Sequence, residues 1–418
     1  MVLFSDIVDF TLSSSLQHFI PAALLVATPK GSPYRYLAIP LLILMGSLFV
    51  RPMDLTAYVR ANAIGSTFTV VITAINLLLV NPLDERDLAR EKPNTFFRSG
   101  HVYYTFEVFL MPRGIATPRQ VKNVPEQPAY LTRHGKEIPV GRFLLRQVVI
   151  LAWQFLVVDL FQELGRQRAL ESGYQPGFKP IPYDVPLEKW IERGATHILA
   201  WFIIGRLLID CPFRLASILF VGLGLDTPAN WPPAFGRLKD VYTLRHFWSK
   251  FWHQFLRQHF TGMSNFISRD VLHLSRPSIL ERYTNVFIVF LQSAIMHIMI
   301  DFVAGIPWKL SGTVAFFMSF VLGFMIEDGV QALWNSIFPP TKTEDGKILT
   351  PLWKKVVGML WTMTWIAVWS TPYLERSMQL PANDLMPIGV VDKTGVTPVG
   401  GAICVGAILL CLTVGPEI

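Results

Sequence analysis

The sequence has few charged residues. Only 16% of its 418 residues are Asp, Glu, Lys or Arg, while 51% are hydrophobic and the mean hydropathy is +0.39. A soluble domain typically carries about 25% charged residues, so this chain lacks the groups that usually cover a water-facing surface. The composition therefore argues against an ordinary cytosolic enzyme, a disordered scaffold and a nucleic-acid-binding protein.

Cysteine is also scarce, and several common catalytic motifs are missing. Cys211, Cys404 and Cys411 lie in apolar stretches and are too few for a disulfide framework or a zinc cluster. The chain has no phosphate-binding loop, no GxSxG turn, no dinucleotide fingerprint and no HExxH zinc motif. The acidic clusters of membrane prenyltransferases are missing too. If the protein is an enzyme, we therefore expect it to use no metal ion.

Long apolar runs are plentiful, and they predict an all-α, polytopic membrane helix bundle. The first run is short and contains Pro21, so we expect eight or nine transmembrane helices. The run at 194–224 contains Arg206, Asp210 and Pro212, and it could form one tilted helix or a broken pair. The candidate spans are 15–28, 36–50, 62–81, 143–162, 194–224, 284–306, 313–338, 354–373 and 398–414.

The positive charge gives a topology. Lys and Arg outnumber Asp and Glu by 37 to 30, and ten basic residues lie in 82–142 and eight in 226–283. Cytoplasmic loops of membrane proteins carry the excess of Lys and Arg, so both stretches are expected on the cytoplasmic side. We treat 1–418 as a single integral membrane domain with an amphipathic cytoplasmic loop-helix region.

The most prominent ionisable residue within a span is His297, in VFIVFLQSAIMHIMIDFVAGIPW. Ser293 and Asp301 lie one turn before and after it on the same helix face. A carboxylate there could fix the tautomer of the imidazole and leave its other nitrogen free as a base. A membrane histidine can also simply hydrogen-bond to a neighbouring helix, and the spacing alone leaves both interpretations open.

The segment VYTLRHFWSKFWHQFLRQHF, residues 241–260, sorts into two faces when it is drawn as a helix. His246, Lys250, His253 and Arg257 form a polar stripe, opposite an aromatic face. The aromatic face consists of Phe247, Trp248, Phe251, Trp252 and Phe255. From amphipathicity alone, we expect this helix to anchor at the membrane surface, with its aromatic side chains in the lipid boundary.

These motifs together resemble the wax synthase-like branch of the membrane-bound O-acyltransferases. The resemblance rests on WPPAFG, then TLRHFWSKFWHQ, then LQSAIMH, and it covers roughly residues 226–300. His253 and His297 are 44 positions apart, and this pairing is more specific than either motif alone. Two positions depart from the pattern: Ile298 stands where plant members often have Glu, and Thr243 replaces the usual Ser.

The resemblance implies an acyl-CoA-dependent O-acyltransferase of the endoplasmic reticulum membrane. His297 would act as general base and His253 would assist, with Asp301, Trp248 and Trp252 as orienting or supporting residues. The phosphates of the coenzyme would bind Arg245, Lys250 and Arg257 at the cytoplasmic mouth.

Fungal members with a WHQ motif commonly acetylate terpenoid or polyketide-terpenoid alcohols, so the resemblance implies acetyl-CoA as co-substrate and a lipophilic polycyclic acceptor. A long-chain wax-ester synthase of the same family is the nearest alternative. A transporter is the alternative from another class, with a polar pathway through ionisable residues of four candidate spans. Those residues are Asp159, Arg206, Asp210, His297, Asp301 and Glu327. A membrane cyclase that uses Asp301 or Glu327 is a weaker option.

Overall fold

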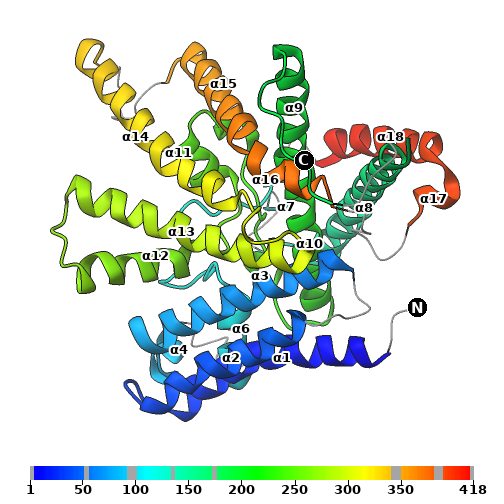
Figure 1. Ribbon diagram of the computed structural model, residues 1–418. Helices are drawn as coiled ribbons and strands as arrows, with labels where there is room; N and C mark the ends of the chain where they lie inside the picture. The colour runs from blue at the N-terminus through cyan, green and yellow to red at the C-terminus, as the bar shows by residue number, and fades with distance from the viewer. Residues whose placement is uncertain are drawn as a thin grey trace.

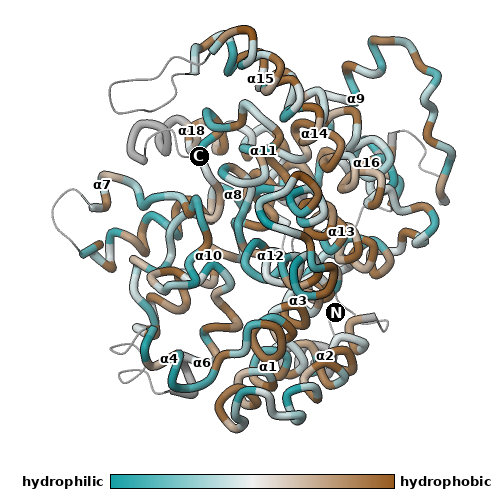
Figure 2. The backbone as a smooth tube through the Cα atoms, turned by 90° about the vertical axis from the view of Figure 1, so that its left-hand side faces the viewer, coloured by the Kyte–Doolittle hydropathy of each residue, from teal (hydrophilic) through white to brown (hydrophobic). Residues whose placement is uncertain are grey.

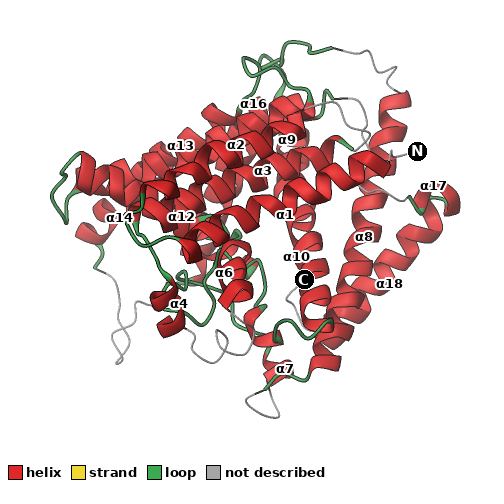
Figure 3. Cartoon of the chain, turned by 90° about the horizontal axis from the view of Figure 1, so that it is seen from below, coloured by secondary structure: helices red, strands yellow, loops and turns green. Residues whose placement is uncertain are grey.

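The computed structural model describes residues 4–50, 56–91, 101–132, 137–171, 177–339, 350–380 and 389–414. Throughout these ranges the regular elements are helices joined by loops, without a strand (Figure 3), which confirms the predicted all-α class. The α-helices are α1 (Phe4–Ala27), α2 (Ala38–Ser47), α3 (Ala57–Ala74), α4 (Glu85–Glu91), α6 (His101–Leu110), α7 (Ala129–Thr132), α8 (Val140–Glu171), α9 (Leu187–Leu199), α10 (Arg206–Gly222), α11 (Leu244–His246), α12 (Arg257–Asn265), α13 (Ile279–Ala304), α14 (Thr313–Ile337), α15 (Leu352–Trp369), α16 (Thr371–Ser377), α17 (Val391–Thr394) and α18 (Val396–Val414).

Four helical stretches in the described part of the chain are long and apolar enough to cross a membrane. They are Tyr58–Val80, Val140–Arg168, Ile279–Ala304 and Thr313–Ile337. Each matches a predicted span, and large apolar side chains such as Leu145, Val330 and Leu333 remain more than 60% exposed on them. Hydrophobic colour follows α1, α2, α3 and α13 in Figure 2. The total of eight or nine spans stays a prediction.

The long run at 194–224 forms one continuous helical path rather than a broken pair. α9 leads into a π-helical segment, Ala200–Gly205, and then directly into α10. Pro212 lies inside α10 and lacks the N–H that would bond to the carbonyl of Leu208. The hydroxyl of Tyr58 on α3 donates to that carbonyl instead, over 2.7 Å. A neighbouring helix therefore supplies the hydrogen bond that the proline removes.

The helices pack in neighbouring groups that contact one another (Figure 1). The amino-terminal helices α1, α2 and α3 lie together with α6, and α13 packs between α3 and α14. α12 lies along α13 and also contacts α3. On the other side α10 packs on α8, α8 on α18, and α9 on α15. This arrangement puts α13, which carries His297, at the centre of the bundle.

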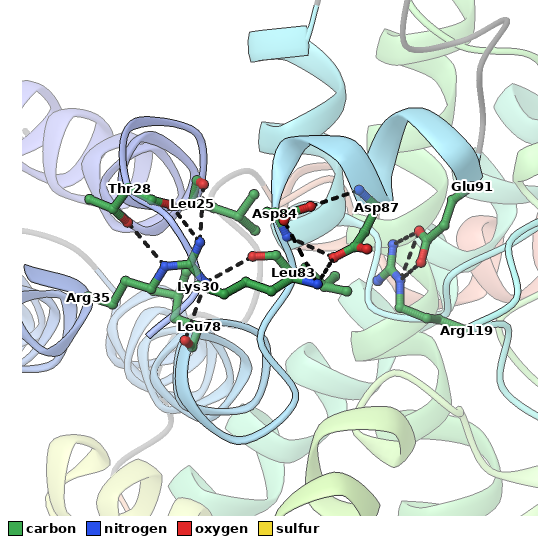
Figure 4. Close-up of polar contacts among 10 residues, drawn as sticks. All are labelled: Leu25, Thr28, Lys30, Arg35, Leu78, Leu83, Asp84, Asp87, Glu91 and Arg119. Carbon is green, nitrogen blue, oxygen red and sulfur yellow. Dashed lines mark hydrogen bonds and ion pairs between the residues drawn. The ribbon is translucent and has the colours of Figure 1, made fainter. Parts of the chain in front are cut away.

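A buried arginine joins the amino-terminal group to the loop before α4 (Figure 4). The Arg35 side chain is fully buried. Its guanidinium donates to the backbone carbonyls of Thr28 at 2.8 Å and Leu83 at 2.9 Å, and more weakly to those of Leu25 and Leu78. The carbonyls of Leu25, Thr28 and Leu78 lie at the carboxyl ends of helical segments, where they lack intrahelical partners, and that of Leu83 lies in the loop before α4. The guanidinium therefore satisfies these carbonyls and its own donors together.

Candidate active site

Helix α13 positions His297 through well-defined ends. Ser278 caps its amino terminus by accepting from the N–H of Glu281, and Gly305 ends it in the left-handed conformation, with φ of 104°. Within the helix, Nδ1 of His297 lies 2.8 Å from the carbonyl oxygen of Ser293. Since a carbonyl can only accept, Nδ1 must carry the proton in this contact. In the neutral ring Nε2 is then the unprotonated nitrogen, with its lone pair available.

The carboxylate of Asp301 does not take the orienting position that its i+4 spacing predicted. Its Oδ2 accepts from the hydroxyl of Ser311, in the loop after α13, at 2.7 Å. The carboxylate is 97% buried and lies toward the carboxyl end of the helix. The backbone carbonyl of Ser293 orients the imidazole instead, because a helical side chain leans back toward the preceding turn.

The segment 241–260 is not the continuous amphipathic helix that its pattern predicted. α11 is followed by a π-helical segment, Phe247–Phe251, and the chain then turns extended at Trp252, with φ of −69° and ψ of 149°. Helix resumes only at Arg257. His253 therefore leaves the polar stripe and lies in the bend between two helical pieces.

The aromatic side chains of this segment pack inside the protein rather than in lipid. Phe247, Phe251 and Trp252 are 0%, 1% and 6% exposed. Trp252 packs edge to face on Trp201, with ring centroids 5.1 Å apart. Trp248 contacts both Phe290 of α13 and Phe320 of α14. The expectation of a membrane-surface anchor was wrong, because the helix breaks and its aromatic face finds partners on α13 and α14.

Two residues next to the bend hold it in shape. The amide of Gln254 donates to the carbonyls of Trp248, at 2.9 Å, and Trp252, at 2.6 Å, and so satisfies oxygens that the break leaves free. The guanidinium of Arg257 donates to the Gln254 amide oxygen at 2.9 Å and fixes which way the amide points. The side chain of Gln254 is 97% buried.

The WPPAFG turn closes against the same bend. The N–H of Gly236 donates to the carbonyl of Phe251 at 2.9 Å. A Cβ at Gly236 would lie 2.0 Å from the backbone oxygen of Lys250, so no larger residue fits at this approach. Arg113 donates to the carbonyls of Pro232 and Pro233, each at 2.7 Å, and so fixes the turn from the other side.

His253 lies between two phenylalanine rings, near enough to His297 for the charges of the two imidazoles to interact. Its ring centroid is 5.9 Å from that of Phe235 and 5.2 Å from that of Phe255. Burial lowers the pKa of His253 to about 3, and the positive charges of a protonated His297 and of Arg113 act in the same direction. The ring is therefore neutral at physiological pH. Its Nδ1 is buried without a hydrogen-bond partner among the described residues.

The three basic residues expected to bind coenzyme phosphates are engaged to different degrees. Arg245 pairs with Asp328 at 2.8 Å, and Arg257 is occupied with Gln254 and two backbone carbonyls. Lys250 is half-buried and has no ion-pair partner in the described ranges. Of the three, Lys250 is the most readily available to an anionic ligand.

The chain resembles characterised proteins along most of its length. It is 36% identical to acetyltransferase spyB of Aspergillus fumigatus, over 94% of this chain and 68% of the relative. It is also 36% identical to acetyltransferase TRI7 of Fusarium sporotrichioides, over 95% and 93%, and 35% identical to acetyltransferase atnC of an Arthrinium species, over 94% and 93%. A model of the membrane bound O-acyl transferase family matches residues 231–319. The chain belongs to this family. No solved structure matches it.

The protein is therefore an acyltransferase enzyme and an integral membrane protein, as its motifs predicted. The segment matched by the family model begins at the WPPAFG turn and includes both His253 and His297. It also includes Gln254, which the sequence did not indicate as a supporting residue. The sequence shows a polar residue beside a motif histidine, but it does not show which groups the amide contacts.

The acidic residues of the alternative transporter pathway are used structurally in this acyltransferase. Glu327 on α14 accepts from the backbone N–H of Leu244 at 2.6 Å and from the indole of Trp361 at 3.1 Å, so it caps the motif segment. Asp159 accepts from two backbone N–H groups at the start of α17. Asp210 pairs within α10 with Arg214 at 2.6 Å. These contacts explain the buried acids without a polar pathway.

Two further residues around the site were missed. Arg113 belongs to the first basic stretch, and the sequence counted it only as a topological charge; burial lowers its pKa to about 10. Tyr373 lies on α16, and its ring centroid is 6.1 Å from that of His297, in an edge-to-face arrangement. No motif precedes it, so only the packing of α16 against α14 reveals this proximity. No group of three or more possible metal-ligating side chains occurs in the part of the chain that was searched.

Proposed function

We propose that this enzyme transfers an acetyl group from acetyl-CoA to a hydroxyl of a lipophilic, polycyclic terpenoid or meroterpenoid alcohol, with Nε2 of His297 as general base. The observation that carries the proposal is the hydrogen bond from Nδ1 of His297 to the carbonyl of Ser293, which leaves the Nε2 lone pair free. The acetyltransferase names of the three relatives support the choice of acyl group.

In the proposed reaction the hydroxyl oxygen of the acceptor attacks the thioester carbonyl as its proton passes to Nε2 of His297. The neutral His253 donates an N–H to the oxyanion of the tetrahedral intermediate. Collapse of the intermediate breaks the carbon–sulfur bond, and the coenzyme thiolate receives the proton held by His297. The transfer is direct, so it needs no covalent acyl-enzyme.

The phosphates of acetyl-CoA would bind on the side where Lys250 lies, with Arg245 and Arg257 nearby in the same segment. Positive-inside bias makes this the cytoplasmic side of the endoplasmic reticulum membrane. The acceptor would reach His297 from within the bilayer. The buried aromatic rings around both histidines would keep water from competing with the alcohol.

The test uses membranes that contain the wild-type protein, incubated with labelled acetyl-CoA or longer acyl-CoAs and a panel of terpenoid and fatty alcohols. We expect labelled ester from acetyl-CoA with the wild type and none with His297→Ala. If His253 supplies an oxyanion donor, His253→Ala should lower kcat by about 100- to 1,000-fold.

His18→Ala is the matched control. Nδ1 of His18 on α1 makes the same contact to the carbonyl four residues earlier, at 2.9 Å to Ser14, and its ring packs on Phe106 of α6 rather than on the site residues. It should therefore keep wild-type activity. Ester formation by His297→Ala would remove the base from the proposal. A preference for long acyl chains and fatty alcohols would replace the acetyltransferase with a wax-ester synthase.

A further inference from the structure

Tyr373 approaches His297 from α16, a helix outside the motif segment. α16 lies beside the loop that joins α13 to α14, whereas α11 is held against the second half of α14 by Glu327. Figure 1 shows α16 and α11 meeting α14 at different points along its length.

The ring of Tyr373 is held rigidly. It stacks on Phe316 with ring centroids 5.6 Å apart, and Trp201 lies 6.3 Å away. Its backbone is fixed by Gly312, where a Cβ would lie 2.0 Å from the carbonyl oxygen of Pro372 and 2.5 Å from the nitrogen of Tyr373. Only glycine permits this approach between the α13–α14 loop and the start of α16.

The hydroxyl of Tyr373, in contrast to its ring, has no hydrogen-bond partner among the described residues. The Tyr373 side chain is partly exposed, although Phe316, on which it stacks, is 0% exposed. His297 is also half-buried. A fixed phenol with an unused donor, next to a histidine with a free lone pair, is suited to hold a hydroxyl between them.

We propose that the Tyr373 hydroxyl binds the acceptor alcohol, donating a hydrogen bond to its oxygen and holding its proton toward Nε2 of His297. This inference rests on the proposed transfer to an alcohol and adds the acceptor subsite. The alcohol then donates to His297 and accepts from Tyr373, and both contacts keep the reacting oxygen in one position. The bond-forming step is unchanged.

The first experiment separates acceptor binding from donor binding. Tyr373→Phe keeps the ring and removes only the hydroxyl. With the panel alcohol that the wild type acetylates fastest, we expect the KM for the alcohol to rise by about three- to tenfold, the loss of one neutral hydrogen bond, while the KM for acetyl-CoA stays constant. Tyr283→Phe is the matched control. It makes the same Tyr-to-Phe change at the amino-terminal end of α13, where it removes a hydrogen bond to Asp328. An unchanged alcohol KM, or an equal rise in both KM values, would overturn the assignment.

The second experiment needs no turnover. Binding of radiolabelled 5α-androstan-3β-ol and of its deoxy analogue, 5α-androstane, is compared on purified wild type and Tyr373→Phe. We expect the wild type to prefer the alcohol about three- to tenfold and the variant to bind both alike. Equal binding of the pair by the wild type, or a preference that survives in Tyr373→Phe, contradicts the subsite. Absence of ester from every alcohol would refute the proposed function without affecting this result.

Discussion

Gln254 should act on catalysis only through the position of His253. Replacing it with methionine keeps the length and much of the volume of the side chain and removes the amide. The variant loses two hydrogen bonds to the carbonyls of Trp248 and Trp252 and one from the guanidinium of Arg257. No other side chain in the described part of the protein donates to the carbonyls of Trp248 and Trp252, so His253 should lose its fixed position.

The magnitude follows from the three bonds. Two neutral hydrogen bonds contribute about 0.5–1.5 kcal/mol each, and one to a charged group about 1.5–3 kcal/mol. Their sum gives about 2.5–6 kcal/mol for the local cost of Gln254→Met. The bond to the carbonyl of Trp252 is buried, whereas the other two are partly exposed to water, so the middle of this range is expected.

The assay is a double-mutant cycle on acyl transfer. Gln254→Met alone should reduce kcat nearly as much as His253→Ala, and adding it to His253→Ala should cause little further loss. Thermal unfolding in detergent shows whether the variants remain folded. Independent, multiplicative losses in the double mutant would refute the reasoning, because they would mean that Gln254 contributes to the site without His253.

Two other predictions concern stability. Gly236→Ala would place a methyl group against the carbonyl of Lys250 and should markedly lower the unfolding temperature. Gly222 has open space around it, so Gly222→Ala should change the unfolding temperature little. Similar effects of the two variants would contradict the close approach at Gly236. His259 is 1% exposed, and neither ring nitrogen has a hydrogen-bond partner within the described ranges; burial, followed by the charge of Arg119, lowers its pKa from 6.5 to about 3. As the pH falls, the imidazole of His259 is therefore protonated in the unfolded chain before it is protonated in the folded protein, so acidification below pH 6.5 should lower the free energy of unfolding by up to about 1.4 kcal/mol per pH unit. His259→Phe should flatten this pH dependence in unfolding measurements at pH 7.5, 6.5 and 5.5. An unchanged slope would refute the prediction.

Hydropathy predicted the long helices well, because a span of apolar residues has few other ways to satisfy its backbone. It could not decide the 194–224 run. Pro212 indicates a break when α10 is considered alone, and continuity depends on the hydroxyl of Tyr58, which comes from α3. A contact between residues 150 positions apart is not encoded in any local pattern.

The site was predicted in part. The spacing of His253 and His297 led to the family, but the surroundings of each depended on backbone geometry. Asp301 was expected to orient His297, yet a main-chain carbonyl does so, and main-chain acceptors are the same in every sequence. Tyr373 was missed because it approaches from another helix, with no motif to mark it.

The π-helical turn at Phe247–Phe251 constrains the number of residues in this segment, independently of which side chains they carry. The N–H of Trp252 donates to the carbonyl of Phe247, five residues back, at 2.7 Å. In an α-helix this donor would bond to the carbonyl four residues back, so deletion of one residue here would restore an ordinary turn and remove the wide turn that ends directly before His253. The number of residues between Thr243 and His253 is therefore fixed by geometry. We infer that insertions and deletions are excluded from this stretch even where substitutions are tolerated, and that related sequences should align across it without gaps.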